Sequence, residues 1–280
     1  MDQMPTVRLG AYTISRLIIG GNPFKGYSHF SEQLDEQMRQ YYTQDRMVEV
    51  LLRCQQHGLT AMQSRGDHEI MDVVRQYRRR GGSMHWICQT ASEWDDIDEN
   101  IRAIAELEPL AIYHHGTNTD QHYKAGTMDV VLRRIELIRS LGLLASVASH
   151  IPECLEWIEQ QGWPVDFYMC SFYNLSRQHH ESKLVTGNGF VDEDHLFGES
   201  DPARMCQFVQ STDKTCIVYK ILGAGRQCAD QQMVRAAFAY ALENIKPGDP
   251  IIVGMYPRDL DQVALNAAHM RELCGQLQQR

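Results

Sequence analysis

The sequence has no long hydrophobic run and no excess of positive charge. None of its apolar stretches approaches the ~20 residues that cross a bilayer, and MDQMPTVRLGAYTIS at the N-terminus lacks the basic and apolar regions of a signal peptide. Asp and Glu number 36 against 27 Lys and Arg, which gives a formal net charge of -9. This balance disfavours nucleic acid or an anionic membrane as the main partner. We therefore expect a cytoplasmic protein.

The cysteines lack the spacing of a zinc site or a disulfide framework. All eight are scattered without a CxxC pair, and several lie inside apolar helix or strand patterns. We expect them to be reduced thiols in a core. A glycine-rich phosphate turn is missing as well, because GGNPFKG at 20–26 does not match GxGxxG.

What the sequence does contain is one repeated pattern of a short apolar run, a polar loop and a segment with helical periodicity. The eight apolar runs are expected strands and lie at 16–21, 59–65, 84–90, 110–115, 143–150, 165–172, 215–222 and 250–255. The expected helices lie at 43–57, 68–80, 97–107, 127–141, 152–161, 201–211, 231–245 and 258–277.

This alternation predicts an α/β protein with a (β/α)8 TIM barrel that spans residues 1–280 as a single domain. Near-continuously apolar strands are typical of a parallel sheet covered by helices. An open doubly wound sheet is the alternative, which the missing glycine-rich turn disfavours. Two long connections, 22–42 and 174–200, follow strands, so they would lie at the carboxyl-end face as lids or as simple insertions.

Polar side chains end most of the predicted strands, and the mouth of a barrel would gather them. The stretch AIYHHGTNTD at 111–120 ends a strand in two histidines before a polar loop. Because side chains alternate along a strand, we expect His115 in the mouth and His114 packed behind it. His150 ends the next strand on the same face as the small residues Ser146 and Ala148.

These strand ends supply the candidate site. A histidine would serve as general base, while a lysine or arginine would stabilise an oxyanion or enolate. The candidate catalytic residues are His115, His150, Lys220, Arg65 and Tyr173. The candidate substrate-binding residues are Asn22, Gln63, Gln89 and Asn174. A divalent metal is an alternative, with His68, His115 and His150 as its ligands.

Each candidate also has a purely structural interpretation. A single histidine on an apolar strand is commonly a hydrogen-bonded core residue, and Lys220 could simply pair with a carboxylate. Asp67, which precedes the helix expected at 68–80, is expected to be its N-cap.

The chain from VRLGAYTISRLIIGG onward resembles the aldo/keto reductase superfamily, whose members are NADPH-dependent (β/α)8 barrels. KILGAGR at 220–226 is similar to the seventh-strand loop of that family, and VDFYMCSFYNL at 165–175 is similar to its sixth strand. Residues 237–267 resemble its closing helix, eighth strand and final helix. The resemblance implies the same barrel fold.

The family's functional residues are mostly replaced in this sequence. Gln63 stands where the family has a catalytic aspartate, Thr90 stands near its catalytic lysine, and no tyrosine follows the second strand. The catalytic histidine alone is kept, as His115 or His114. The expected cofactor contacts are replaced by His150, Cys170 or its neighbour, and Met255. The resemblance thus implies a divergent member that lacks most of the catalytic tetrad, with NADPH less expected than a divalent metal.

Three functions remain open at this point. The first is a non-redox enzyme, a lyase, isomerase or hydrolase of histidine acid–base chemistry, metal-assisted or not, that acts on a small carbonyl-bearing or carbohydrate-like molecule. The second is an NADPH-dependent aldo/keto reductase. The third is a catalytically inactive barrel with a binding role. The expected partner is a small-molecule substrate, and assembly into a homo-oligomer stays open.

Overall fold

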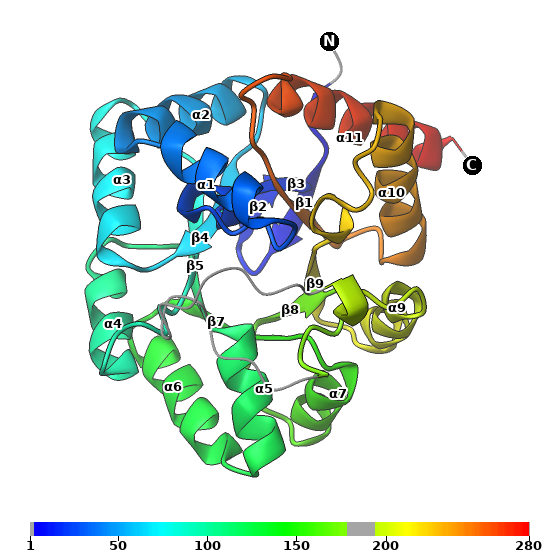
Figure 1. Ribbon diagram of the computed structural model, residues 1–280. Coiled ribbons are helices and arrows are strands. Elements are labelled where there is room, and N and C mark those ends of the chain that lie inside the picture. Colours follow the sequence, from blue (N-terminus) through cyan, green and yellow to red (C-terminus); the bar gives the residue numbers. More distant parts are fainter. Residues whose placement is uncertain (1–2, 178–193, 280) are drawn as a thin grey trace.

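Eight parallel strands close into a barrel in the order β10-β3-β4-β5-β6-β7-β8-β9 in the computed structural model, which describes residues 3–177 and 194–279 (Figure 1). The strands are β3 (Leu17–Gly20), β4 (Ala61–Arg65), β5 (His85–Gln89), β6 (Ala111–His114), β7 (Leu144–Ser149), β8 (Phe167–Ser171), β9 (Thr215–Tyr219) and β10 (Ile251–Gly254). Each predicted strand is present, so the TIM barrel is confirmed.

Helices surround the barrel (Figure 1). They are α1 (Glu32–Tyr41), α2 (Gln44–Gln56), α3 (His68–Arg79), α4 (Ile97–Ala105), α5 (Gly116–Ala125), α6 (Met128–Ser140), α7 (Pro152–Gln160), α9 (Asp201–Ser211), α10 (Gln231–Asn244) and α11 (Gln262–Gln278). All eight predicted helices are confirmed with shifts of a few residues at their ends. Among the described residues no helix is long and apolar enough to span a membrane.

Side-chain caps begin several of these helices. Asp67 accepts a hydrogen bond from the backbone N–H of Ile70 at 3.0 Å, so its predicted N-cap role in α3 is confirmed. Thr43 does the same for α2, and Asp230 for α10. These caps satisfy N–H groups that the first helical turn leaves without partners.

Two connections contain helices that the sequence analysis did not predict, and a third lies mostly outside the described residues. The predicted polar loop after His115 is helix α5, which the polar sequence GTNTDQHYKA concealed because it has little amphipathic character. The long connection 22–42 contains the short 3-10 helix η1 (Asn22–Lys25) and α1. Most of the connection 174–200 falls on 178–193, outside the described residues; its described part includes η2 (Asp194–Leu196).

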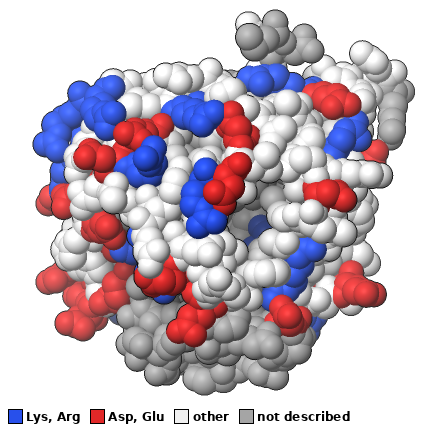
Figure 2. Space-filling model, turned by 45° about the horizontal axis from the view of Figure 1, so that its top comes forward, with Lys and Arg blue, Asp and Glu red and all other residues white. Residues whose placement is uncertain are grey.

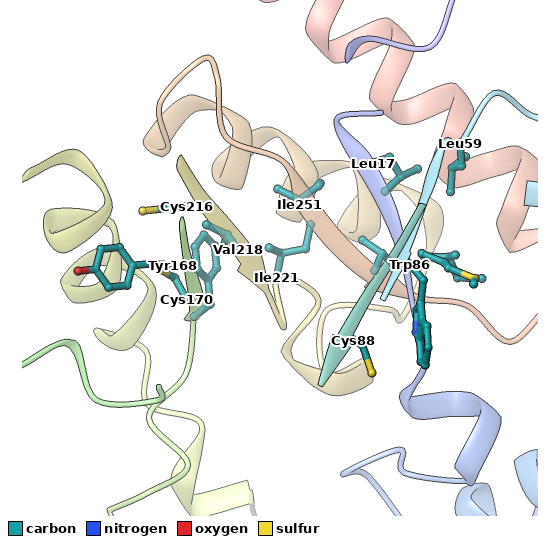
Figure 3. Close-up of a cluster of buried hydrophobic side chains, with 14 of the residues drawn as sticks. Leu17, Leu59, Trp86, Cys88, Tyr168, Cys170, Cys216, Val218, Ile221 and Ile251 are labelled. Atoms are coloured by element: carbon teal, nitrogen blue, oxygen red, sulfur yellow. The ribbon is translucent and has the colours of Figure 1, made fainter. Parts of the chain in front are cut away.

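Two buried layers hold the barrel together. The outer layer lies between strands and helices, and Figure 3 shows part of it, where Trp86 and Cys88 of β5 and Tyr168 and Cys170 of β8 belong to the same cluster as Leu17. The inner layer fills the barrel with side chains such as Ile18, Ile87, Phe167 and Ile217. All eight cysteines are free and seven are buried; the exception to the predicted core placement is Cys228, which is exposed.

An antiparallel hairpin that the sequence analysis missed precedes the barrel. Strands β1 (Thr6–Leu9) and β2 (Tyr12–Ser15) pair with each other and not with the barrel sheet. Val7, Leu9 and Ile14 pack in the inner layer, where Leu9 and Ile14 are fully buried. The hairpin therefore covers the amino-end of the barrel and completes its core.

Replacing Leu9 by Ala should destabilise the protein by about 2–5 kcal/mol, because the substitution leaves a cavity in the inner layer. Urea denaturation followed by circular dichroism measures the change. The matched control is Thr6→Ala in the same hairpin, whose side chain is exposed and whose effect should be small. Equal losses of stability in the two variants would show that the hairpin is not part of the core.

Candidate active site

A cavity of about 740 Å³ opens among the residues that follow the barrel strands. Each of the eight barrel strands or the segment that follows it contributes to its lining, together with α1. The cavity therefore occupies the carboxyl-end face, where barrel enzymes house their chemistry. Figure 2 shows a hollow on one face of the molecule with Lys or Arg atoms visible inside it.

Most of the predicted site residues line this cavity. They are Asn22, Gln63, Arg65, Gln89, His115, His150 and Lys220. Three others do not: His68, Tyr173 and Asn174. The three exceptions lie at the start of α3 and in the loop after β8.

His150 is held by a buried carboxylate. Its Nδ1 lies 2.8 Å from Oδ2 of Asp120, and its backbone N–H donates to the two carboxylate oxygens at 3.2 and 3.3 Å. Asp120 is 1% exposed and also accepts from the hydroxyls of Ser149 and Ser176. Because Asp120 engages Nδ1, Nε2 is the ring nitrogen left for a ligand in the cavity.

The adjacent histidines take different sides, as the alternation predicted. His115 lines the cavity, and its backbone N–H donates to Oγ1 of Thr90 at 3.0 Å. His114 is fully buried behind it, with Nδ1 2.8 Å from Oγ1 of Thr119 and Nε2 3.1 Å from Nη1 of Arg134. His114 is thus a structural residue between the barrel and α6.

Burial gives both histidines a low proton affinity. The loss of water around the ring lowers the pKa of His115 well below its usual range, and the positive charge of Arg65 lowers it further. Burial is also the main cause that lowers the pKa of His114, followed by the charge of Arg134. Both rings are therefore neutral at pH 7.

Gln63, Tyr113 and Gln89 line the cavity and are linked in series by hydrogen bonds; we call this group the floor of the cavity. Nε2 of Gln63 donates to the phenolic oxygen of Tyr113 at 2.7 Å, and the Tyr113 hydroxyl donates to Oε1 of Gln89 at 3.0 Å. Burial raises the pKa of Tyr113, so the phenol keeps its proton. The two amides are thereby held in fixed orientations against the cavity.

Lys220 reaches the cavity from a strained backbone. Its φ is 64°, in the left-handed region that costs a residue with a side chain on the order of 1–3 kcal/mol. Its Nζ lies 3.3 Å from Nε2 of His29, which is itself 3.4 Å from Nδ2 of Asn22. The contact joins the loop after β3 to the end of β9 across the mouth.

Gly116 allows α5 to begin directly against the site. A Cβ at this position would lie 3.2 Å from Cε1 of His150, 3.4 Å from Cβ of Ala148 and 3.4 Å from the hydroxyl of Tyr219. A side chain there would crowd the imidazole. The glycine thus lets the first turn of α5 approach His150 closely.

Two predicted residues serve the loop after β8 instead of the cavity. The ring of Tyr173, predicted to be catalytic, packs on Phe197 at 5.0 Å between centroids. Asn174, predicted to bind substrate, shapes a turn in which its Oδ1 accepts from Ser176 and its backbone N–H donates to Asp201. Both follow the last residue of β8, so strand alternation no longer fixes their direction.

The predicted metal ligands are not brought together. His68 begins α3 and stacks on Trp94 at 4.5 Å, outside the cavity lining to which His115 and His150 belong. In ranges 3–177 and 194–279, no group of three or more His, Cys, Asp or Glu side chains is placed to hold a metal ion. The set His68, His115 and His150 is therefore corrected.

The sequence analysis missed three residues of the site. Asp120, Tyr113 and Tyr219 all contact the predicted residues, and Tyr113 and Tyr219 line the cavity. The signal for Tyr113 was available, because it shares a strand face with His115. Asp120 lies five residues beyond His115. Its contact with His150 could be predicted only if α5 were known to be a helix.

Comparisons with solved structures support the fold. The chain matches a truncated 3-deoxy-D-arabino-heptulosonate 7-phosphate synthase from Thermotoga maritima at 13% identity and a TM-score of 0.54, covering 99% of this chain and 92% of that one. It matches Yersinia pestis DHPS at 11% identity and a TM-score of 0.56, covering 99% and 100%. The aldolase QR15 matches at 10% identity and a TM-score of 0.52, covering 82% and 90%. Identities this low show a shared fold alone.

The comparisons overturn the aldo/keto reductase membership. No protein-family model matches the chain, and no curated protein matches its sequence. The three matching structures described above are a synthase, DHPS and an aldolase. The motifs that suggested the family, such as KILGAGR, are features of strands and turns in a barrel. The NADPH alternative depended on that membership and has no family resemblance behind it.

Acid should destabilise the protein through His114 and His115. Their pKa is lowered in the folded state, so below about pH 6.5 the unfolded chain takes up protons that the folded chain does not bind. The free energy of unfolding should fall by up to about 1.4 kcal/mol per pH unit for each histidine. Urea denaturation at pH 7.5, 6 and 5 should show a shallower fall in His114→Gln. An unchanged pH slope in this variant would contradict the lowered pKa.

Proposed function

We propose that the protein is a non-redox enzyme in which His150 moves a proton on a small carbonyl-bearing or carbohydrate-like substrate. The observation that carries this proposal is the buried contact between Asp120 and Nδ1 of His150, next to a cavity at the carboxyl ends of the strands. A carboxylate in this position fixes the tautomer and the orientation of an imidazole that acts as general base. The same carboxylate stabilises the imidazolium that forms when Nε2 accepts the proton.

The remaining cavity residues suit the charge that proton removal creates. Abstraction of a proton beside a carbonyl group places negative charge on the carbonyl oxygen, which becomes an enolate. Arg65 and Lys220 supply positive charge at the cavity wall. The ring of His115 is neutral at pH 7, so it adds no positive charge to the cavity. It can donate one hydrogen bond and accept another.

The side-chain amides of Gln63 and Gln89 would orient the substrate. Gln63 and Gln89 are tied to Tyr113 and keep further donor and acceptor capacity for hydroxyl or carbonyl groups. Fixed polar groups of this kind favour a polyhydroxylated or keto substrate over an apolar one. The reaction classes that fit are isomerisation, in which the proton returns to the substrate, elimination, in which it passes to the leaving group, and hydrolysis, in which His150 takes it from water. None of the three needs an external oxidant or reductant.

His150→Gln should lower turnover by about 10²- to 10⁴-fold, because a positioned general base contributes that much to the rate. Asp120→Asn should lower it as well, since the amide no longer fixes the tautomer that presents Nε2 as acceptor. The measurement is deuterium incorporation from D2O into a panel of keto acids, hydroxy acids and sugars, followed by NMR without added cofactor.

The control is His122→Gln, since His122 bonds Thr127 on the outside of the barrel and does not line the cavity. It should exchange deuterium at the wild-type rate. Exchange that is equally fast in wild type and His150→Gln would contradict the proposal. Binding of a panel compound without any exchange would favour a catalytically inactive barrel with a binding role.

A further inference from the structure

The lining of the cavity holds cationic side chains and no carboxylate, although the protein is acidic. Among the described residues that line it, Arg65, Lys220 and Arg226 are cationic and none is Asp or Glu, whereas the chain as a whole carries a formal net charge of -9. Cations collected in a partly enclosed cavity attract anions, since low-dielectric walls focus their field. This contrast points to a ligand of negative charge.

Arg226 is engaged in holding the loops. Its Nη1 donates to the carbonyl of His29 at 3.0 Å, its Nη2 pairs with Asp194, and its guanidinium lies 3.7 Å from the ring centre of Phe197. The protein itself therefore uses the donors of Arg226, and Asp194 offsets its charge.

Arg65 uses only part of its hydrogen-bonding capacity within the described residues. The residue is 7% exposed, and its hydrogen bonds to Ser92 and Glu93 both use Nη2. Its Nε has no hydrogen-bond partner among the described residues. The bonds to Ser92 and Glu93 do not use Nη1, and the planar fork of Arg is suited to carboxylate and phosphate.

The N-terminus of α5 supplies a second set of donors beside Arg65. Its N-cap, His115, makes no side-chain capping bond, and His115, Gly116 and Thr117 all line the cavity. The first N–H groups of a helix have no partner within it and carry the positive end of its dipole. Arg65 lines the same cavity as this helix end.

Asp120, one turn farther along α5, does not cancel this positive field. Its carboxylate is 1% exposed and accepts hydrogen bonds from His150, Ser149 and Ser176. These hydrogen bonds compensate much of its negative charge. Gly116 meanwhile keeps the helix end open and within van der Waals reach of His150.

We infer that the substrate carries an oxyanion group, a carboxylate or a phosphate, which binds between the guanidinium of Arg65 and the first turn of α5. This inference rests on the proposed function for its link to catalysis, because the site lies beside His150. It narrows the substrate class from neutral sugars and ketones to sugar acids, keto acids, hydroxy acids or sugar phosphates. The anion anchors the molecule while the reacting carbon faces Nε2.

The test is a titration of the ¹⁵N-labelled, deuterated full chain with sodium acetate and, separately, with inorganic phosphate at constant ionic strength. Backbone amide shifts of Gly116 and Thr117 are expected to move and to saturate. Arg65→Gln should weaken the binding by about 10- to 100-fold, the loss expected for charge-assisted hydrogen bonds. Tighter binding of acetate indicates a carboxylate substrate, and tighter binding of phosphate indicates a phosphorylated one.

Two further variants make the result decisive. Arg75→Gln is the matched control, because Arg75 pairs with Asp72 in an exposed i,i+3 contact on α3. This variant should bind both anions like the wild type. The double variant Arg65→Gln/Glu93→Gln removes both partners of the Arg65–Glu93 pair and should also lose binding while keeping its fold. Absence of saturable shifts at Gly116 and Thr117, or equal affinity in wild type and Arg65→Gln, would overturn the inference.

Failure of this inference is distinguishable from failure of the proposed function. His150→Gln should lose deuterium exchange but bind acetate or phosphate within a few-fold of the wild type. Unchanged exchange in His150→Gln together with saturable shifts at Gly116 would remove the catalytic role of His150 and leave the anion site standing. Lost exchange in His150→Gln without those shifts would do the reverse.

Discussion

The buried carboxylate of Asp120 is the interaction on which the candidate site depends. An ionised carboxylate removed from water is costly unless hydrogen-bond donors surround it. Here the donors come from the end of β7, as Ser149 and His150, and from Ser176 in the loop after β8. Satisfying one charge therefore fixes α5, β7 and that loop relative to one another, and it sets the direction of His150 in the same arrangement.

Much of the fold could be predicted because each barrel strand is marked by the hydrophobic pattern of its own few residues. Each strand from Leu17–Gly20 to Ile251–Gly254 is a short apolar run between turn residues, and alternation within those runs places Gln63, Arg65 and His115 in the mouth. The prediction stops where the period stops. Tyr173 and Asn174 lie beyond β8, so neighbouring loops determine where their side chains lie.

Other parts of the structure depend on contacts that are distant in the sequence. The polar helix α5 has no strong apolar face, and its first turn is held by neighbours such as Thr90, whose hydroxyl accepts from the N–H of His115. The role of Asp120 appears only when α5 is placed against β7. The family resemblance failed for a related reason, since turn and strand motifs such as KILGAGR report the geometry of a barrel and not the chemistry at its mouth.

The hairpin formed by β1 and β2 determines from which end of the barrel a ligand can reach the cavity. Its side chains Leu9 and Ile14 fill the amino-end of the barrel, so the axis is a packed core and not a passage. In the part of the chain that the structure describes, arriving and departing molecules thus share the carboxyl-end mouth. A molecule that occupies the cavity therefore blocks entry of the next one, so ligands of this cavity compete with one another.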